Sequence, residues 1–179
     1  LTIACTFAPL SEVEDVARMT PEQMDKAADE GKFFLFHDGQ KVKCSRGVNS
    51  LTTTVQGKGA AFQKIKILDA IDQIQSDLRL SIQDGYIGKY ANSYDNKCLL
   101  IAAVKGYLES LELEGVLKEG SVVGIDLAKQ RNYLNSQGMD TESMDDLSIK
   151  KADTGSHVFL KASVKILDAI EDIDLDISI

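Results

Sequence analysis

The stretch Asp172-Ile-Asp-Leu-Asp-Ile-Ser-Ile179 alternates acidic or polar residues with large aliphatic residues. Successive side chains of an extended strand point to opposite faces, so this period of two predicts a strand with one apolar and one acidic face. Such a strand must cover its apolar face and pair its edge with another strand. The partner can lie within the same chain or on a neighbouring molecule, by strand addition.

The negative charge is concentrated in the same region. The 179 residues include 20 Lys or Arg and 28 Asp or Glu, for a formal net charge of −8, and residues 168–179 hold five of the acids and no Lys or Arg. The rest of the chain is therefore nearly balanced. Binding to nucleic-acid phosphates needs a basic surface, so this charge argues against nucleic acid as the main partner. No apolar run approaches the roughly 20 residues of a membrane span, so we expect no membrane insertion of this chain.

Two long helices are predicted in the middle of the chain. Apolar residues at steps of three and four run from Phe62 to Ile82, which predicts a helix over about 61–83 that Gly85 ends. A second helix is expected over about 96–114, capped by Asp95 and ended by Gly115. Its Leu99–Val104 run is apolar nearly all round, so we expect this helix to be buried.

Shorter elements surround these helices. Thr20-Pro-Glu-Gln23 is typical of a helix start, with a capping box and Pro at the first position. A hairpin is predicted over about 32–46 because Asp38-Gly39 suits a tight turn between two strand-like runs. Further strands are expected at Leu1–Cys5, Ser121–Leu127 and His157–Ile166. Short helices are expected at 128–137 and 143–151. The fold class is therefore α/β of the α+β type, with a mixed or antiparallel sheet, two long packed helices and an alternating C-terminal strand.

One hexapeptide occurs twice. Lys66-Ile-Leu-Asp-Ala-Ile71 is repeated as Lys165-Ile-Leu-Asp-Ala-Ile170, the first in a helical pattern and the second beside a strand. We interpret this as a coincidence between two apolar segments. It indicates that local sequence does not settle conformation here.

Residues suited to catalysis or metal binding are few. His37 and His157 have no nucleophile motif around them, and both are interpreted as structural or surface histidines. The cysteines are odd in number and widely spaced, which favours buried free thiols in a protein made in a reducing compartment; they are Cys5, Cys44 and Cys98. Residues 56–60 resemble a phosphate loop only in part. We therefore expect no enzyme activity, no cofactor and no metal.

The beginning of the chain points to a longer polypeptide. It starts at Leu1 without Met, and no charged segment of a secretory signal precedes the strand-like first residues. We expect this chain to be the C-terminal piece of a longer protein, whose missing part holds the partner of that first strand.

Three stretches, in order along the chain, carry a resemblance to a known family. They are Arg46-Gly-Val-Asn-Ser-Leu-Thr-Thr53, then Tyr86-Ile-Gly-Lys89 with Asn92-Ser-Tyr-Asp-Asn-Lys-Cys-Leu99, then Thr154-Gly-Ser-His-Val-Phe-Leu-Lys-Ala162. With the Ile/Asp tail they resemble contractile phage tail sheath proteins, in particular the sheaths of clostridial phages, phage-like elements and R-type bacteriocins. The resemblance covers only the C-terminal half of such a protein.

The resemblance implies a virion structural protein of a contractile injection system. Such subunits are homo-oligomers that stack as six-fold rings in a helical assembly around a tail tube, and contraction drives the tube through a cell envelope. The implied partners are neighbouring copies, the tail tube protein and the baseplate. The implied location is a virion or bacteriocin tail, made in the bacterial cytoplasm and released as an assembled particle.

The resemblance also assigns parts of this chain to subunit linkage by β-strand donation. Residues 1–156 belong to the inner domain and 157–179 to terminal strands. The linking arm is 171–179, with Asp172, Ile173, Asp174, Leu175, Asp176, Ile177 and Ile179. The candidate receiving strand His157–Ile166 contributes Val158, Leu160, Ala162 and Val164. Flanking hinges such as Asp168–Asp172 are expected to bend. An alternative is a soluble adaptor module that pairs its acidic terminal strand with a partner's sheet.

Overall fold

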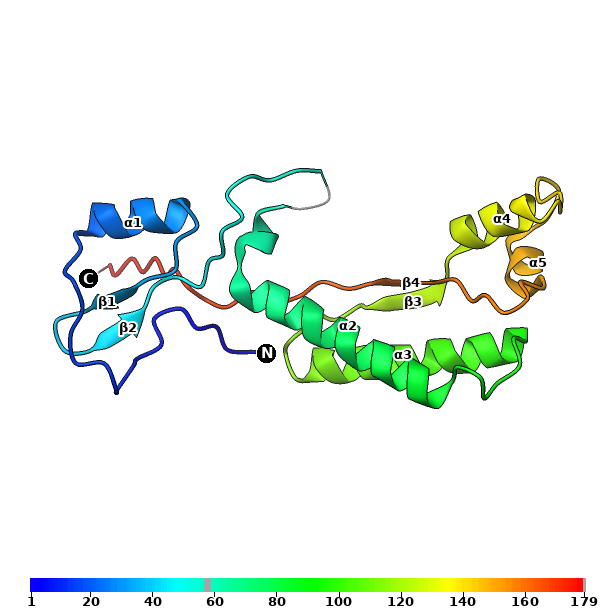
Figure 1. Ribbon diagram of the computed structural model, residues 1–179, viewed down its shortest axis with the longest axis horizontal. Helices are drawn as coiled ribbons and strands as arrows, with labels where there is room; N and C mark the ends of the chain where they lie inside the picture. Colours follow the sequence, from blue (N-terminus) through cyan, green and yellow to red (C-terminus); the bar gives the residue numbers. More distant parts are fainter. Residues whose placement is uncertain (57–58, 179) are drawn as a thin grey trace. The chain divides into compact units, whose positions relative to one another are not determined.

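The computed structural model describes residues 1–56 and 59–178, and the chain divides into two compact units (Figure 1). The first unit consists of residues 1–73 and 167–178, and the second of Ile74–Ile166. Both combine helices with small antiparallel strand pairs, which confirms the expected α+β class. The division into 1–156 and 157–179 stays a prediction.

The first unit contains a capped helix and a hairpin. Helix α1 (Pro21–Asp29) begins at Thr20, whose side chain and that of Gln23 form the predicted capping box. Strands β1 (Leu35–His37) and β2 (Val42–Cys44) pair antiparallel, as predicted for the hairpin.

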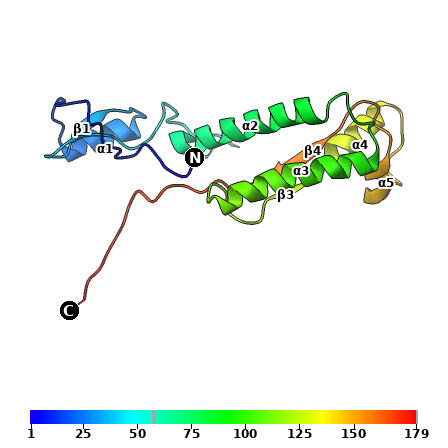
Figure 2. The same cartoon turned by 90° about the horizontal axis from the view of Figure 1, so that it is seen from below.

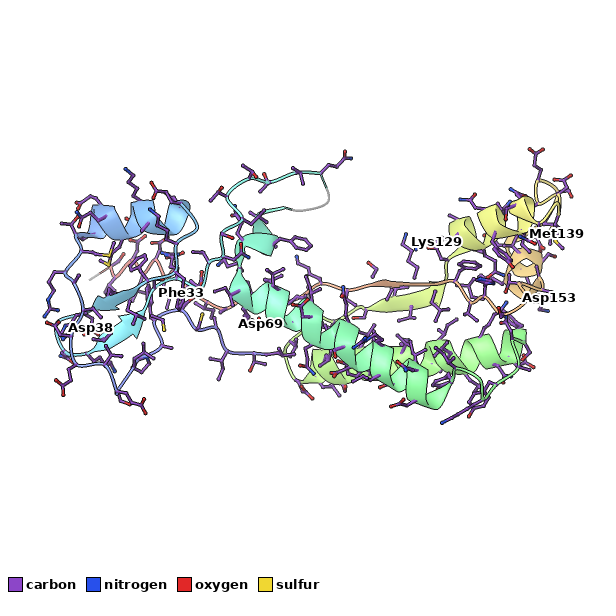
Figure 3. All side chains as sticks on the ribbon, viewed as in Figure 1. Phe33, Asp38, Asp69, Lys129, Met139 and Asp153 are labelled. Carbon is purple, nitrogen blue, oxygen red and sulfur yellow. The ribbon has the colours of Figure 1, made fainter. Side chains whose placement is uncertain are left out.

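The hairpin turn is built around Asp38. Its Oδ1 accepts the backbone N–H groups of Gln40 at 2.8 Å and Lys41 at 2.9 Å, and its other oxygen pairs with Lys43 at 2.5 Å. Gly39 has φ +104°, a conformation that a residue with a Cβ rarely adopts. Figure 3 shows Asp38 at this end of the hairpin. The hydrogen bonds from Lys43 and the backbone lower the pKa of Asp38.

The predicted first strand, Leu1–Cys5, is not formed within this chain. Residues 1–5 are in neither helix nor strand, and the segment that pairs lies slightly later. Leu10 N–H donates to Val42 O, and Cys44 N–H donates to Ala8 O, both at 2.9 Å. The outer edge of β2 is therefore satisfied by residues 8–10, which the apolar pattern did not distinguish from the residues before them.

The second unit is built on two helices and a two-stranded ribbon. Helix α2 (Ile65–Gly85) follows a short 3₁₀ turn, η1 (Ala60–Gln63), and its later residues lie beside α3 (Tyr94–Leu113) (Figure 2). Tyr107 of α3 donates to Asp77 of α2 at 2.7 Å, and burial with this bond raises the pKa of Tyr107.

The ribbon consists of β3 (Val122–Ile125) and β4 (Leu160–Ser163), which pair antiparallel. Helices α4 (Leu127–Ser136) and α5 (Asp146–Lys151) occupy the connection between the two strands, at the positions predicted for the short helices. The core of this unit is aliphatic and includes Val104, Leu108, Leu111, Val116, Leu117, Leu134 and Ile149.

Two expectations for α3 are wrong. Its cap is Ser93, which accepts the N–H of Asn96, whereas Asp95 lies inside the first turn. The helix is also not buried all round, because Leu99 is 56% exposed. Among the described residues, α3 buries Lys97, Val104, Leu108 and Leu111, whereas Leu99 and Leu113 stay open to solvent.

Candidate functional site: the terminal arm, its anchor and the β3–β4 ribbon

The terminal arm exposes its apolar side chains. Ile173, Leu175 and Ile177 are 80%, 75% and 76% exposed. No residue from 171 to 178 belongs to a helix or strand, and Figure 2 shows the red terminal segment as an extended trace. The predicted terminal strand is thus not formed within this chain, because a strand needs a partner edge. Ile179 lies outside the described residues.

The base of the arm is held by Glu171, whose side chain is only 7% exposed. Its Oε1 accepts a hydrogen bond from Thr6 Oγ1 at 2.6 Å, and its Oε2 pairs with Lys64. These contacts join residues that are 165 and 107 positions apart in the chain. A carboxylate this well covered needs such partners, since burying an unpaired charge is costly.

Asp172 and Asp168 extend this contact set. The two terminal nitrogens of Arg46 donate parallel hydrogen bonds to the two carboxylate oxygens of Asp172, at 2.9 and 2.5 Å. This bidentate geometry suits a guanidinium and a carboxylate. Lys64 Nζ lies 3.1 Å from Asp168. The bond from Arg46 lowers the pKa of Asp172. Partial burial raises the pKa of Asp168, but the bond from Lys64 and further contacts outweigh it and lower the value.

Lys66 completes the anchor, which we define as Thr6, Arg46, Lys64 and Lys66 with residues 167–172. Lys66 is 7% exposed, and its Nζ donates to Leu167 O at 2.6 Å. The two copies of the repeated hexapeptide therefore touch each other, the first within α2 and the second outside any helix. The expected bending segment Asp168–Asp172 is tied down by these contacts.

The first family-like stretch supplies part of this anchor. Gly47 N–H donates to Thr6 Oγ1 at 2.9 Å, and a Cβ at Gly47 would lie 2.9 Å from Cys5 Sγ. Glycine is favoured here because any Cβ would force the side chain of Cys5 to shift, with Thr6 Oγ1 also close at 3.3 Å. Asn49 joins the same loop to η1, because its side-chain Nδ2 donates to Phe62 O at 2.7 Å.

The second and third family-like stretches meet in the other unit. Asn92 Nδ2 donates to Thr154 Oγ1 at 3.1 Å, Gly155 O at 2.7 Å and His157 O at 3.0 Å. Lys97, which is 3% exposed, contacts Thr154 Oγ1 at 3.3 Å, and burial lowers its pKa. Together they fix the turn that leads into β4.

The candidate receiving residues lie on and beside β4. Leu160 and Ala162 are in the strand, while Val158 and Val164 flank it and are 40% and 39% exposed. The predicted strand His157–Ile166 is shorter than expected, although Leu117 and Ile166 form an isolated bridge beyond its end. Among the described residues β4 pairs with β3 alone, so one edge of each strand has no strand partner.

Sequence reasoning found the arm and missed its anchor. Arg46 stood in a family-like stretch, but nothing local linked it to Asp172, which lies 126 positions away. Lys64 directly precedes α2, and no local pattern links it to Asp168 or Glu171. A lysine-rich helix start and an acidic tail are complementary in charge, which was the one signal available.

The histidines and cysteines occupy ordinary structural positions. His37 Nδ1 accepts the N–H of Gly39 at 2.9 Å, and His157 lies among aromatic rings, 5.0 Å from that of Tyr133. The three cysteines are free, as expected, but only Cys44 is buried and Cys98 is exposed. This corrects the expectation of three buried thiols.

Within 1–56 and 59–178, no group of three or more His, Cys, Asp or Glu is placed to hold a metal ion. No helix in this part of the chain combines the length and apolar character needed to cross a membrane. The partial phosphate-loop pattern at 56–60 includes residues outside the described ones.

Comparison with known proteins connects these features to one family. The family model of the phage tail sheath C-terminal domain matches residues 57–179. The tail sheath protein of Clostridium phage phiCD119 is 38% identical over 174 residues, which are 97% of this chain and 49% of that protein. The chain thus spans about half the length of this relative.

Solved structures of sheath proteins share the fold. The crystal structure of a sheath tail protein from Desulfitobacterium hafniense has a TM-score of 0.62 at 19% identity, covering 93% of this chain and 37% of that one. The contracted helical sheath of the anti-feeding prophage has a TM-score of 0.69 at 16% identity, covering 99% of this chain and 45% of that one. The chain belongs to the family of phage tail sheath proteins, and residues 57–179 match their C-terminal domain.

Proposed function

We propose that this chain forms the C-terminal half of a structural subunit that polymerises around a tail tube and contracts to drive the tube through a cell envelope. The observation that carries the proposal is the arm. Three large aliphatic side chains are at least 75% exposed, while the base of the same segment is fixed by Glu171 and Asp172. A segment anchored at one end and unpaired beyond it is suited to link one copy to another.

The exposed residues supply the driving force for linkage. Burying an aliphatic side chain of this size contributes roughly 1.5–3 kcal/mol, so Ile173, Leu175 and Ile177 together favour association strongly. Strand addition would also satisfy the unpaired backbone groups of the arm and of a receiving edge. We propose that this edge belongs to the β3–β4 ribbon of a neighbouring copy, since one edge of each strand has no strand partner within residues 1–56 and 59–178.

The anchor supports a bending point just after Asp172. Because residues 167–172 are held by Thr6, Arg46, Lys64 and Lys66, rotation between linked copies would occur after Asp172. The link would then persist while subunits move. The work of contraction would come from a difference in subunit contacts between the extended and contracted arrangements, because a switch requires such a difference. No catalysed reaction and no cofactor are involved.

The remaining partners follow from the same proposal. A sheath of this kind surrounds a tail tube protein and ends on a baseplate, in the tail of a virion or a headless bacteriocin. The protein would be synthesised in the bacterial cytoplasm and would leave the cell in the assembled particle.

The test is removal of residues 171–179 from the full-length protein, followed by negative-stain microscopy. We expect the intact protein to form ordered tubes or striated polymers and the deletion variant to lose them. Normal contractile sheaths from the deletion variant would contradict linkage by the arm. Persistent monomers of the intact protein under many conditions would instead favour the adaptor module.

A further inference from the structure

Strand β4 has two chemically different faces. Alternation along an extended strand places Leu160 and Ala162 on one face and Lys161 and Ser163 on the other. The register with β3 agrees, because Lys161 lies opposite Gly124 and Ala162 lies opposite Val123. Continued to the bridge at Ile166, the alternation adds Val164 to the apolar face and Lys165 to the basic one.

The lysines of this basic face have no acidic partner. Lys161 and Lys165 are exposed, and among residues 1–56 and 59–178 no carboxylate oxygen lies within 4.0 Å of either ammonium nitrogen. Asp174 and Asp176 of the arm are likewise exposed and free of ion pairs among these residues. Asp172 differs from them because Arg46 already holds it.

From these patterns we infer that charge sets the register of the proposed linkage: where the arm of one copy lies along β4 of a second copy, Asp174 and Asp176 stand beside Lys161 and Lys165. The inference rests on the proposed function and names the residues that set its register. Ile173, Leu175 and Ile177 are buried only if they share the face of Leu160, Ala162 and Val164. That choice places the acids on the lysine face, and a slip of one residue would put aliphatic side chains beside the lysines.

The spacing allows this pairing in more than one alignment. On the lysine face, Ser163 lies between the two lysines, and in the arm the acids recur at every second position. An aspartate opposite Ser163 has a lysine on each diagonal, within reach of a long side chain. Each aspartate is therefore opposite or diagonal to a lysine, whichever of these alignments forms.

The β3 edge does not offer the same complement. The residues of β3 on the corresponding face are Val122 and Gly124, and neither carries a charge. Beyond the end of β3, Lys118 lies opposite Lys165, because its N–H donates to Lys165 O at 2.8 Å. An arm added on this side would therefore meet one lysine at most, whereas β4 and its continuation present two. Charge therefore selects β4 over β3, although the backbone of either edge can pair.

The inference is tested by charge reversal in the full-length protein. The variants are D174K/D176K in the arm, K161E/K165E on β4, and the combination of all four changes. Sheath assembly is measured as the lowest protein concentration that forms polymer, by sedimentation and negative-stain microscopy. The single reversal K161E is compared with K41E, which reverses an exposed lysine of the hairpin outside β4.

Each double reversal is expected to raise that concentration about 5- to 30-fold, because two attractive cross-strand pairs become repulsive. The fourfold variant should return to within about threefold of the unmodified protein, since its charges are again complementary. K41E should assemble like the unmodified protein, and K161E should be weaker. Recovery in the fourfold variant also shows that the double variants can fold.

Two outcomes would overturn the inference. One is normal assembly of both double reversals, and the other is a fourfold variant that assembles no better than either double variant. Two neutral double variants, D174N/D176N and K161Q/K165Q, test the same contacts without introducing repulsion. Each should lose less assembly than the charge reversals do, and its assembly concentration should no longer depend on salt. The deletion of 171–179 separates the two proposals: if deletion abolishes assembly while reversals do not matter, strand donation stands and the β4 charge register fails.

Discussion

Replacing Glu171 with Ala removes the central carboxylate of the anchor. The side chain of Glu171 is 7% exposed, accepts a 2.6 Å bond from Thr6 and pairs with Lys64, whose own side chain is 28% exposed. The substitution leaves a threonine hydroxyl and an ammonium group with fewer partners in a largely covered site. It therefore tests whether the anchor stabilises the first unit.

The expected loss can be worked from these contacts. A hydrogen bond to a charged group contributes about 1.5–3 kcal/mol, and leaving a covered partner unsatisfied increases the loss. Lys64 keeps Asp168 at 3.1 Å, which limits the effect. We therefore expect E171A to lower the free energy of unfolding by roughly 2 kcal/mol.

The assay is urea unfolding of the unassembled full-length protein, with D174A as the matched control. D174A removes an exposed arm carboxylate that has no ion pair among the described residues, so it should change the free energy of unfolding by less than about 0.5 kcal/mol. A loss in E171A no larger than that in D174A would refute the anchor as a stabilising contact.

Acid should weaken the same anchor. Arg46 lowers the pKa of Asp172 from its ordinary value of 3.8 in the folded protein. A lowered pKa means that stability from this contact is present above pH 3.8 and is lost as pH falls through the folded value. The difference in unfolding free energy between the unmodified protein and R46A should therefore shrink on acidification below that pH. A difference that stays constant with pH would contradict the assignment.

Three further substitutions or labelling tests follow from the geometry. G47A should destabilise the first unit by about 1–3 kcal/mol because of the contact with Cys5, and C5A should recover part of the loss; a neutral G47A would contradict the close approach. N92A should lower the free energy of unfolding by about 1–3 kcal/mol, measured by urea unfolding, and an unchanged value would show that the turn before β4 does not need it. Cys98 should react with a thiol reagent in the unassembled protein before Cys44 does, and the reverse order, read by mass spectrometry, would contradict their exposure.

Local patterns predicted the elements well where one physical signal dominated. The capping box at Thr20, the Asp38-Gly39 turn and the stripe of α2 each specify conformation through neighbouring residues, and all three were confirmed. The predicted boundaries of β4 were less accurate. The strand extends only as far as β3 pairs with it, and the sequence of β4 alone does not show where that pairing stops. The identical hexapeptides at 66 and 165 adopt different conformations, so their surroundings decide the outcome.

The site was harder to predict because its contacts are distant in sequence. The alternating arm was visible as a pattern, yet Thr6 and Arg46 reach it across 165 and 126 positions. The burial of α3 was overestimated for a related reason. An apolar run shows that a helix surface can be buried, but it does not show whether another part of the same chain packs against that surface. Leu99 illustrates this, since it belongs to an apolar run and is 56% exposed.

The most direct test of the account is a helical reconstruction of the assembled full-length protein at a resolution that shows side chains. The account predicts residues 173–178 of each copy as a strand added to the ribbon of a neighbouring copy, with Glu171 still held by Thr6 and Lys64 of its own chain. An arm that folds back on its own copy, or copies joined without any exchanged strand, would contradict it.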